Sequence, residues 1–439
     1  MTMLQISYYR VFVTVSFGVL LVAPIYAQDY PVSQLEADAR RAGLRVLNGT
    51  HLTLVTDRPS RTDDGIPELP AVFDQAFNVW CNHFNIAPEK YSGWKAFGCL
   101  VVERERFREA GLLPDDIPDF SNGFCDRNRF WIMDQSNPNY RRHLMLHEGV
   151  HAFTICLKEL NAPAWYTEGI AEMLATHRLE ESPFPHFVST PIPARASDVE
   201  QLGRIEEIQR LHRTNRMPSI AQVFAMRGSA HGKLSLYAST WATVAMLSLH
   251  PRYSKEFSSL ERGSLDQSFT TRLTTSPTWN SAEATRDFDA FTDEIDYGYD
   301  FQRSAVDWDP GTVLHTGRHI EVRADQGWQN SGIRLQPAKR YVIHAGGRVL
   351  IGHSQAGPLE SEPQGISLSW HRRWPIGRLL AAQWTQDSDG SRPRFVLVSE
   401  GIGGNIKPLV EGPLFFKVNE SPGQLADNAG SYEVHVQPQ

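Results

Sequence analysis

The stretch LMLHEGVHAF, residues 144–153, holds two histidines four positions apart, with a glutamate directly after the first. In an α-helix, residues four apart share one face, so His147 and His151 would present imidazole nitrogens to the same ion. Glu148 is rotated by about 100° from His147, so its carboxylate would reach a water molecule rather than the ion. The pattern predicts a zinc hydrolase site with Glu148 as general base. The alternative is a surface helix with two unrelated histidines.

A second helical segment follows and offers a third ligand. It is APAWYTEGIAEM, residues 162–173, with Pro163 near its start. Sixteen residues separate His151 from Glu168, enough to end one helix, turn and return antiparallel. Glu168 and Glu172 stand four apart and would repel each other on a bare helix, a conflict that a cation would remove. The alternative is that both carboxylates face solvent.

Together, HEGVH and WYTEGIAEM resemble the gluzincin metallopeptidases, in particular the secreted peptidase-MA-like families, over roughly residues 45–260. In those peptidases the glutamate of a downstream E-G-x-A motif completes the metal site. The resemblance implies zinc as cofactor, and it assigns the following roles: zinc ligands His147, His151 and Glu168, and general base Glu148. No G-x-M-E-N motif of the aminopeptidases is present, so endopeptidase action is the default expectation.

Four further polar residues lie near the two motifs. Glu172 has no ligand role in the family pattern and is expected to orient a histidine ring. Aminopeptidase-type gluzincins use a tyrosine on a later helix to bind the oxyanion, and by this resemblance Tyr237 is the candidate hydroxyl donor, ahead of Tyr166, with a core aromatic as the alternative. His143, one turn before the first motif histidine, is expected to face solvent.

The hydrophobic pattern predicts the α+β class, and the gluzincin resemblance implies that the domain is zincin-like. Strand-like and helix-like runs alternate over residues 50–130, and the helical period dominates over 140–260, which predicts an α+β domain with a mixed sheet. Residues 128–134, NRFWIMD, are read either as the sheet-edge strand that pairs with substrate or as a core strand. The Pro-rich segment ESPFPHFVSTPIPARAS, residues 181–197, is predicted to be a loop. Gly149, unfavourable inside a helix, would allow a neighbouring element to come close.

The C-terminal region has only short β-type runs between turns, which predicts an all-β, jelly-roll-like sandwich. Its segment NESPGQLADNAGS, residues 419–431, resembles the loop of the calcium-dependent galactophilic lectins of PA-I type, over about residues 315–439. By position, four oxygen donors take the calcium places and one glutamine takes a sugar-contact place: Glu420, Gln424, Asp427 and Asn428, and Gln364. The loop departs from the family at three positions, so a sandwich that has lost sugar binding is the alternative.

The N-terminus predicts export. The apolar run after Arg10 and the small residue Ala27 read as a signal peptide, with an uncleaved anchor as the alternative. The expected division is residues 1–27 signal peptide, 28–305 metallopeptidase domain and 312–439 lectin-like domain. In an oxidising compartment, the four cysteines allow up to two disulfides in three connectivities, while Cys156 reads equally as a free thiol.

Composition narrows the function. The chain is 41% hydrophobic and 21% charged, as globular proteins are, and its net charge of -7 gives no footprint for nucleic acid. We therefore expect a secreted or periplasmic zinc peptidase acting on peptides or proteins, with no membrane span after signal cleavage and glycosylated substrates if the C-terminal domain binds glycans. Two alternatives stay open: a catalytically silent calcium- and glycan-binding protein, and a zinc amidase with a non-protein substrate.

Overall fold

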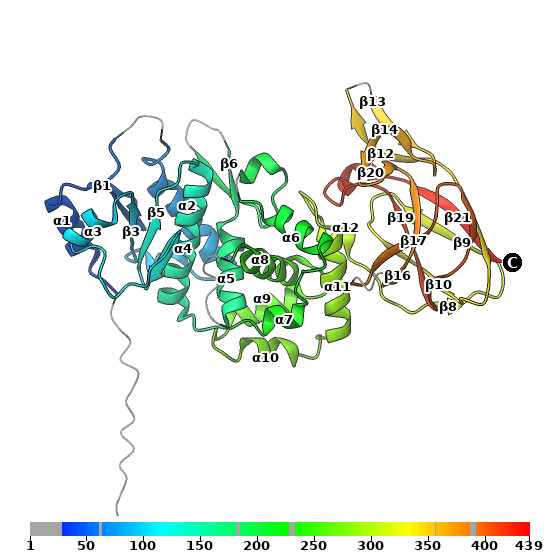
Figure 1. The fold of residues 1–439 in the computed structure, drawn as a ribbon, viewed down its shortest axis with the longest axis horizontal. Coiled ribbons are helices and arrows are strands. Elements are labelled where there is room, and N and C mark those ends of the chain that lie inside the picture. Colours follow the sequence, from blue (N-terminus) through cyan, green and yellow to red (C-terminus); the bar gives the residue numbers. More distant parts are fainter. Residues whose placement is uncertain are drawn as a thin grey trace, which may run out of the picture.

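The computed structural model describes residues 29–60, 64–180, 185–200, 202–227, 233–355, 357–386 and 392–439. The chain is mixed α plus β, with a helix-rich part beside a β-rich part (Figure 1). No described helix has an apolar stretch long enough to cross a membrane. The predicted signal peptide lies outside the described residues, and the three predicted domain boundaries stay a prediction.

A five-stranded sheet carries the N-terminal region. Its spatial order is β1 (Arg45–Asn48), β2 (Leu52–Thr56), β3 (Ala96–Val101), β5 (Arg129–Met133) and β4 (Gly123–Asp126). The three central strands are parallel, and the two outer strands run antiparallel to their neighbours. This is the mixed sheet that the pattern predicts, whereas the finer zincin-like assignment stays a prediction.

The sequence allows residues 128–134 to be either a sheet-edge strand or a core strand, and the structure has them as a core strand. Strand β5 lies between β3 and β4, and four of its five residues are buried. The sheet edge is instead β4, whose four-residue sequence GFCD is too short to show an alternating pattern. Among the described residues, no further strand pairs with the outer side of β4.

Helices cover both faces of this sheet. Helices α2 (Leu69–His83) and α4 (Pro138–Lys158) share one hydrophobic core with it, and α1 (Val32–Arg41) and α3 (Arg104–Glu109) share another on the opposite face. Helix α4 starts at Asn137, whose side chain accepts a hydrogen bond from the Tyr140 backbone N–H. Its middle, from Arg141 to Thr154, is buried on every side.

The remaining helices extend the layer away from the sheet. Helix α5 (Ala164–Ala175) packs between α4 and α8 (Leu234–Leu249). The segment 181–197 is not the plain loop predicted from its prolines, since it contains β7 (His186–Ser189), which pairs with β6 (His177–Glu180) in a two-stranded ribbon. Prolines stand before and after β7 but not within it, so no ladder hydrogen bond is lost. The other helices are α6 (Arg204–Arg213), α7 (Ile220–Phe224), α9 (Ser254–Arg262), α10 (Phe269–Thr274), α11 (Ser281–Glu294) and α12 (Phe301–Ser304).

Two sheets share one hydrophobic core in the β-rich part. One has the order β17 (Arg394–Glu400), β16 (Leu379–Thr385), β19 (Gly412–Val418), β10 (Gln329–Leu335) and β8 (Thr312–Val313); the other has the order β18 (Gly403–Ile406), β11 (Tyr341–Gly346), β21 (Ser431–Pro438) and β9 (Arg318–Arg323). Shorter strands lie beside them: β12 (Val349–Ser354), β13 (Gly357–Ser361), β14 (Ile366–His371), β15 (Trp374–Ile376) and β20 (Asn428–Ala429). The jelly-roll connectivity stays a prediction.

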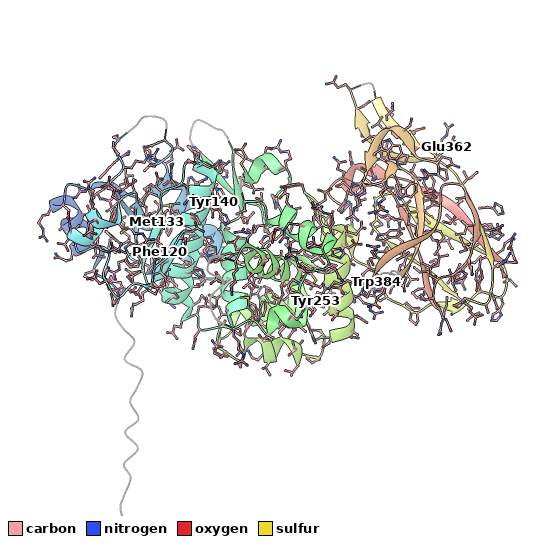
Figure 2. All side chains as sticks on the ribbon, viewed as in Figure 1. Phe120, Met133, Tyr140, Tyr253, Glu362 and Trp384 are labelled. Carbon is pink, nitrogen blue, oxygen red and sulfur yellow. The ribbon has the colours of Figure 1, made fainter. Side chains whose placement is uncertain are left out.

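An aromatic cluster joins the two parts of the chain. Trp308, Trp328, Phe395 and Phe415 pack together with Ala290 of α11. Trp328 is stacked on Phe395, with 4.5 Å between ring centroids, and is therefore core. Figure 2 shows Trp384 of the same cluster where α11 meets the β-rich part.

All four cysteines are free thiols, so none of the three disulfide connectivities is formed. Burial raises the pKa of Cys81 to about 11. Burial is also the largest cause of the raised pKa of Cys156, about 12. Cys156 is half-buried, with its Sγ 3.4 Å from the Asp29 Oδ1 atom.

Gly149 is where α2 comes closest to α4. A Cβ there would lie 2.5 Å from Phe73 Cε2 and 3.0 Å from Trp80 Cη2. The close neighbour is thus an aromatic core and not an element over the metal centre. We expect Gly149→Ala to lower the free energy of unfolding by about 1–3 kcal/mol, because overlap outweighs the better helix propensity of alanine. Urea titration measures this, and Gly93→Ala, with nothing within 4 Å of its Cβ, is the control that should lose no stability.

Candidate metal centre

Three side chains from α4 and α5 converge on one point. His147 Nε2 and His151 Nε2 are 3.1 Å apart, and the Glu168 Oε2 atom lies 3.6 Å from the first and 3.7 Å from the second. Atoms bonded at 2.0–2.1 Å to a tetrahedral zinc ion are about 3.3–3.4 Å apart. The three separations bracket that value, so this donor set fits zinc.

The two helices bring these side chains together by simple geometry. One turn of α4 stacks His147 and His151, and the linker 159–163 returns the chain antiparallel so that Glu168 faces them. Next to it, Gly169 lets α8 approach, because a Cβ there would lie 2.5 Å from the Thr240 carbonyl oxygen. The close packing of α5 against α8 holds the ligand glutamate in place.

The electrostatics of the cluster favour a positive charge at its centre. Burial opposes ionisation of Glu168, but contact with His147 and His151 holds its pKa below the usual range. Burial would also lower the pKa of His147, yet the carboxylates of Glu168 and Glu172 outweigh it and raise the pKa to about 10. The same negative environment, with its three converging donor atoms, could hold a metal ion.

Glu172 lies behind the first histidine. Its Oε1 atom is 3.2 Å from His147 Nδ1, while Arg204 donates two hydrogen bonds of 2.8 and 2.9 Å to its two oxygens. A carboxylate on the outer nitrogen of a ligand histidine fixes the orientation of the ring. Arg204 has no counterpart in the sequence motifs, because it stands 32 residues further along the chain, at the start of α6.

His143 is buried, at 4% exposure, which contradicts the expectation that it faces solvent. Its Nε2 atom lies 3.4 Å from the Glu172 Oε2 atom, and burial lowers the pKa of the ring, so it is held inside as a neutral imidazole. His143, His147 and Glu172 form a second group with metal-ligating side chains. Arg204 already donates hydrogen bonds to both oxygens of Glu172. The group of His147, His151 and Glu168 is therefore the better candidate metal centre.

Glu148 points toward the edge of the sheet. It is buried, at 6% exposure, and a Cβ on Gly123 of β4 would lie 2.8 Å from its Cδ atom. The carboxylate therefore lies against the edge strand, beside the three converging ligand atoms. A peptide that paired with β4 would pass next to Glu148.

Gly123 is expected to be necessary for the position of Glu148. In Gly123→Ala the new methyl group overlaps the carboxylate, and the flexible Glu148 side chain gives way before the strand does. We expect hydrolysis to fall roughly tenfold to a hundredfold, as for an ångström-scale misplacement of a catalytic group, while bound metal stays unchanged. Initial rates and metal content measure the two effects. Unchanged rates would separate Glu148 from the reaction, and Gly93→Ala again serves as control.

The two candidate tyrosines differ in position. The Tyr237 ring is 5.8 Å from the His147 ring and 5.5 Å from the Arg204 guanidinium, so Tyr237 borders the metal centre. Burial and then the carboxylate of Glu168 raise its pKa, which keeps the hydroxyl protonated as a donor. Tyr166 is fully buried and donates to the Glu261 Oε1 atom at 2.9 Å, which commits its hydroxyl to the core.

The candidate calcium residues lie on one loop of the β-rich part. Glu420 is buried, and burial raises its pKa to about 7, with Asp427 adding to the effect. The Asn428 Oδ1 atom is buried without a hydrogen-bond partner, whereas Gln424 is exposed. The candidate sugar contact Gln364 is exposed and lies against Gly401. The Glu420 Oε1 atom accepts a hydrogen bond from the Ser421 backbone N–H, so Asn428 Oδ1 is the unpartnered buried oxygen of this loop that fits a cation.

Comparison with known proteins identifies no family for this chain and gives a weak structural likeness. No protein family matches this sequence, and no curated protein matches it either. Among solved structures, the chain has a partial likeness to one titled "EclA N-terminal domain; PllA-like lectin", at 20% identity and a TM-score of 0.20, over 29% of this chain and 98% of that one. A likeness this weak carries no argument. The gluzincin resemblance therefore rests on the residues of its two motifs.

Proposed function

We propose that this chain is an exported zinc-dependent peptidase. The observation that carries the proposal is the convergence of His147 Nε2, His151 Nε2 and Glu168 Oε2 within 3.1–3.7 Å, with the Glu148 carboxylate close enough to raise the pKa of His147. Two imidazoles and one carboxylate are the protein ligands of a class of hydrolytic zinc sites that includes peptidases.

A zinc ion held by His147, His151 and Glu168 would lower the pKa of a water molecule and polarise a carbonyl group. The Glu148 carboxylate takes a proton from the attacking water and returns it to the leaving amine nitrogen. Glu172, fixed by Arg204, keeps the His147 ring oriented with Nε2 toward the centre.

The substrate is proposed to bind as an extended strand. The outer side of β4 offers backbone N–H and C=O groups that no described strand uses, and it borders Glu148. A peptide added antiparallel to β4 would be held by main-chain hydrogen bonds, with its scissile carbonyl group beside the water molecule that Glu148 deprotonates. This arrangement favours a peptide over the non-protein amide of the alternative function.

Tyr237 is proposed to donate its hydroxyl to the oxygen that becomes negative during attack. We expect Tyr237→Phe to lower kcat about a hundredfold with little change in KM, since the donor acts mainly in the transition state. Steady-state kinetics on a cleaved peptide measure both constants. A larger change in KM than in kcat would assign the hydroxyl to substrate binding, and Tyr91→Phe, on a half-buried tyrosine outside the site, is the control.

For the C-terminal part, we propose a calcium-assisted glycan-binding role for the loop with Glu420, Gln424, Asp427 and Asn428, together with Gln364. It is supported by the buried oxygens of Glu420 and Asn428. Glycan binding would tether the peptidase to glycosylated substrates and raise their local concentration. A glycan array probed with and without calcium tests this proposal. Glycan binding that is equal in the two conditions would contradict it.

The peptidase proposal is tested on a defined peptide library. The mature protein is stripped with a chelator, reloaded with zinc and incubated with the library, and products are identified by mass spectrometry. We expect new peptide termini only in the reloaded sample. Stoichiometric zinc without cleavage of any peptide would reject the peptidase and leave the amidase, and absence of bound zinc would leave the silent binding protein.

A further inference from the structure

A cavity of about 970 Å³ lies where the helix-rich part meets the β-rich part. Its walls come from the C-terminal ends of α6 and α11, from the turn between β14 and β15, and from β17 and β19. Figure 1 shows these elements side by side at the junction. Small-molecule sites typically have about 300–1,000 Å³, so the cavity has room for a ligand of several rings.

The cavity is positively charged although the chain as a whole is negative. Its lining has five basic side chains and two carboxylates, whereas the whole chain has a net charge of -7. The basic residues are Arg213, Arg372, Arg373, Arg394 and Lys417. Burial and then the nearby arginines lower the pKa of His212, which also lines the cavity, to about 4. The potential inside the cavity therefore favours an anion.

The two carboxylates neutralise only part of this charge. Glu294 forms ion pairs with Lys417 at 2.6 Å and with Arg372 at 3.2 Å. Among the residues that the structure describes, Arg213 and Arg373 have no ion-pair partner. Each of these two exposed guanidinium groups can donate a bidentate pair of hydrogen bonds to a carboxylate, sulfate or phosphate.

The cavity also has polar atoms that are buried and unused. The indole N–H of Trp328 and the Nε2 atom of His212 both line it, and neither has a hydrogen-bond partner within the described residues. Buried polar groups in native proteins nearly always have partners, so such atoms mark places where a ligand or water belongs. None of His147, His151, Glu168 and Glu172 lines the cavity, whereas Asn419, the first residue of the loop with Glu420, does.

Aromatic rings complete the wall. Trp328, Trp374 and Phe395 line the cavity together with the cations, and Trp374 is half-buried. Flat apolar rings match the C–H faces of sugar rings, while an acidic peptide carries its carboxylates on flexible side chains without such faces. The amide group of Gln209 and the exposed Asn215 add partners for hydroxyl groups.

We propose that this junction cavity binds an anionic saccharide, a sugar chain that carries carboxylate or sulfate groups. Arg213 and Arg373 bind its anionic groups, and Trp374 packs against a sugar ring. Helix α6 connects this cavity to the metal centre, because Arg204 contacts Glu172 at its start and Arg213 ends it, about 13.5 Å further along the axis. The cavity would hold an acidic glycan of a substrate or surface near the peptidase centre, but the binding itself does not rest on the proposed peptidase function.

The test is equilibrium binding in a chelator, which removes any contribution of zinc or of the calcium loop. Fluorescently labelled heparin hexasaccharide and hexagalacturonate, one sulfated and one carboxylated, are titrated with the full mature chain, and neutral maltohexaose is the ligand control. We expect one or both acidic sugars to bind in a salt-dependent manner and maltohexaose not to bind. The two acidic arms show which anionic group is preferred.

Variants locate the site. Arg213→Ser and Arg373→Ser, on different segments, are each expected to weaken binding about tenfold, as loss of a charged hydrogen-bond pair does. Arg216→Ser removes a neighbouring exposed arginine that does not line the cavity and should change Kd less than twofold. Binding that both cavity variants leave unchanged, or absence of binding to either acidic sugar, would overturn the proposal. Hexaglutamate and ATP are tested as anions without a sugar chain of this kind. If either binds at least as tightly as the acidic sugars, and Arg213→Ser and Arg373→Ser weaken that binding equally, the saccharide assignment would be overturned.

Discussion

Replacing Glu168 with alanine is expected to remove zinc from the protein, lowering its zinc affinity at least about a hundredfold. The variant loses one of three converging donor atoms and the only carboxylate among them. Changes to groups that merely orient the ligands lower affinity about 10–100-fold, so loss of a ligand itself should do more. Elemental analysis of the zinc-reloaded and dialysed protein should find one zinc per chain in the parent and much less in the variant.

The matched control is Glu109→Ala, which removes an exposed glutamate from α3 and should leave zinc content unchanged. Glu168→Ala also leaves His147 and His151 without their carboxylate partner, so circular dichroism must show that the fold is retained. If the folded variant still holds one zinc per chain with the affinity of the parent, the group of His143, His147 and Glu172 would become the metal centre instead.

The parts of the site that follow local rules were predictable from the sequence. The helix predicted to carry LMLHEGVHAF is α4, Pro138–Lys158, and the antiparallel return to Glu168 needs only the short linker before Pro163. Spacing along a helix fixes which side chains share a face, so the proximity of His147 and His151 follows from the sequence alone. Glu168 lies on another helix, and its place beside them was predicted through the resemblance to the E-G-x-A motif.

The parts that depend on tertiary contact were not predictable. The sequence predicts His143 as a surface residue, because its contact with Glu172 is formed only in the folded protein. Glu172 is in turn bound by Arg204, which comes from a helix without a recognisable motif. Strand β4 is too short for a periodic signal, so the edge of the sheet was open between two readings. The junction cavity draws its lining from α6 to β19, more than two hundred residues apart, and only the packing of the two parts creates it.

Glu148→Gln is expected to lower kcat about a thousandfold while zinc remains bound. Glutamine has nearly the volume and shape of glutamate, so it fits between α4 and Gly123, but its amide cannot accept the proton of the attacking water. General base catalysis by a positioned side chain contributes about 10²–10⁴-fold. The carboxylate is buried beside the converging ligands, where no solvent group can replace it efficiently.

Zinc content and activity together decide the role of Glu148. Loss of activity at full zinc occupancy assigns Glu148 to the chemical step, whereas parallel loss of zinc and activity would assign it to the metal site. Glu172→Gln is the informative comparison. The Glu172 carboxylate contacts His147 and not the reacting groups. This variant should therefore weaken zinc binding more than it lowers the rate of the zinc-loaded enzyme. If Glu148→Gln keeps more than about a tenth of the parent rate, the general base lies elsewhere. The proposed mechanism would then be wrong even with its zinc ligands correct.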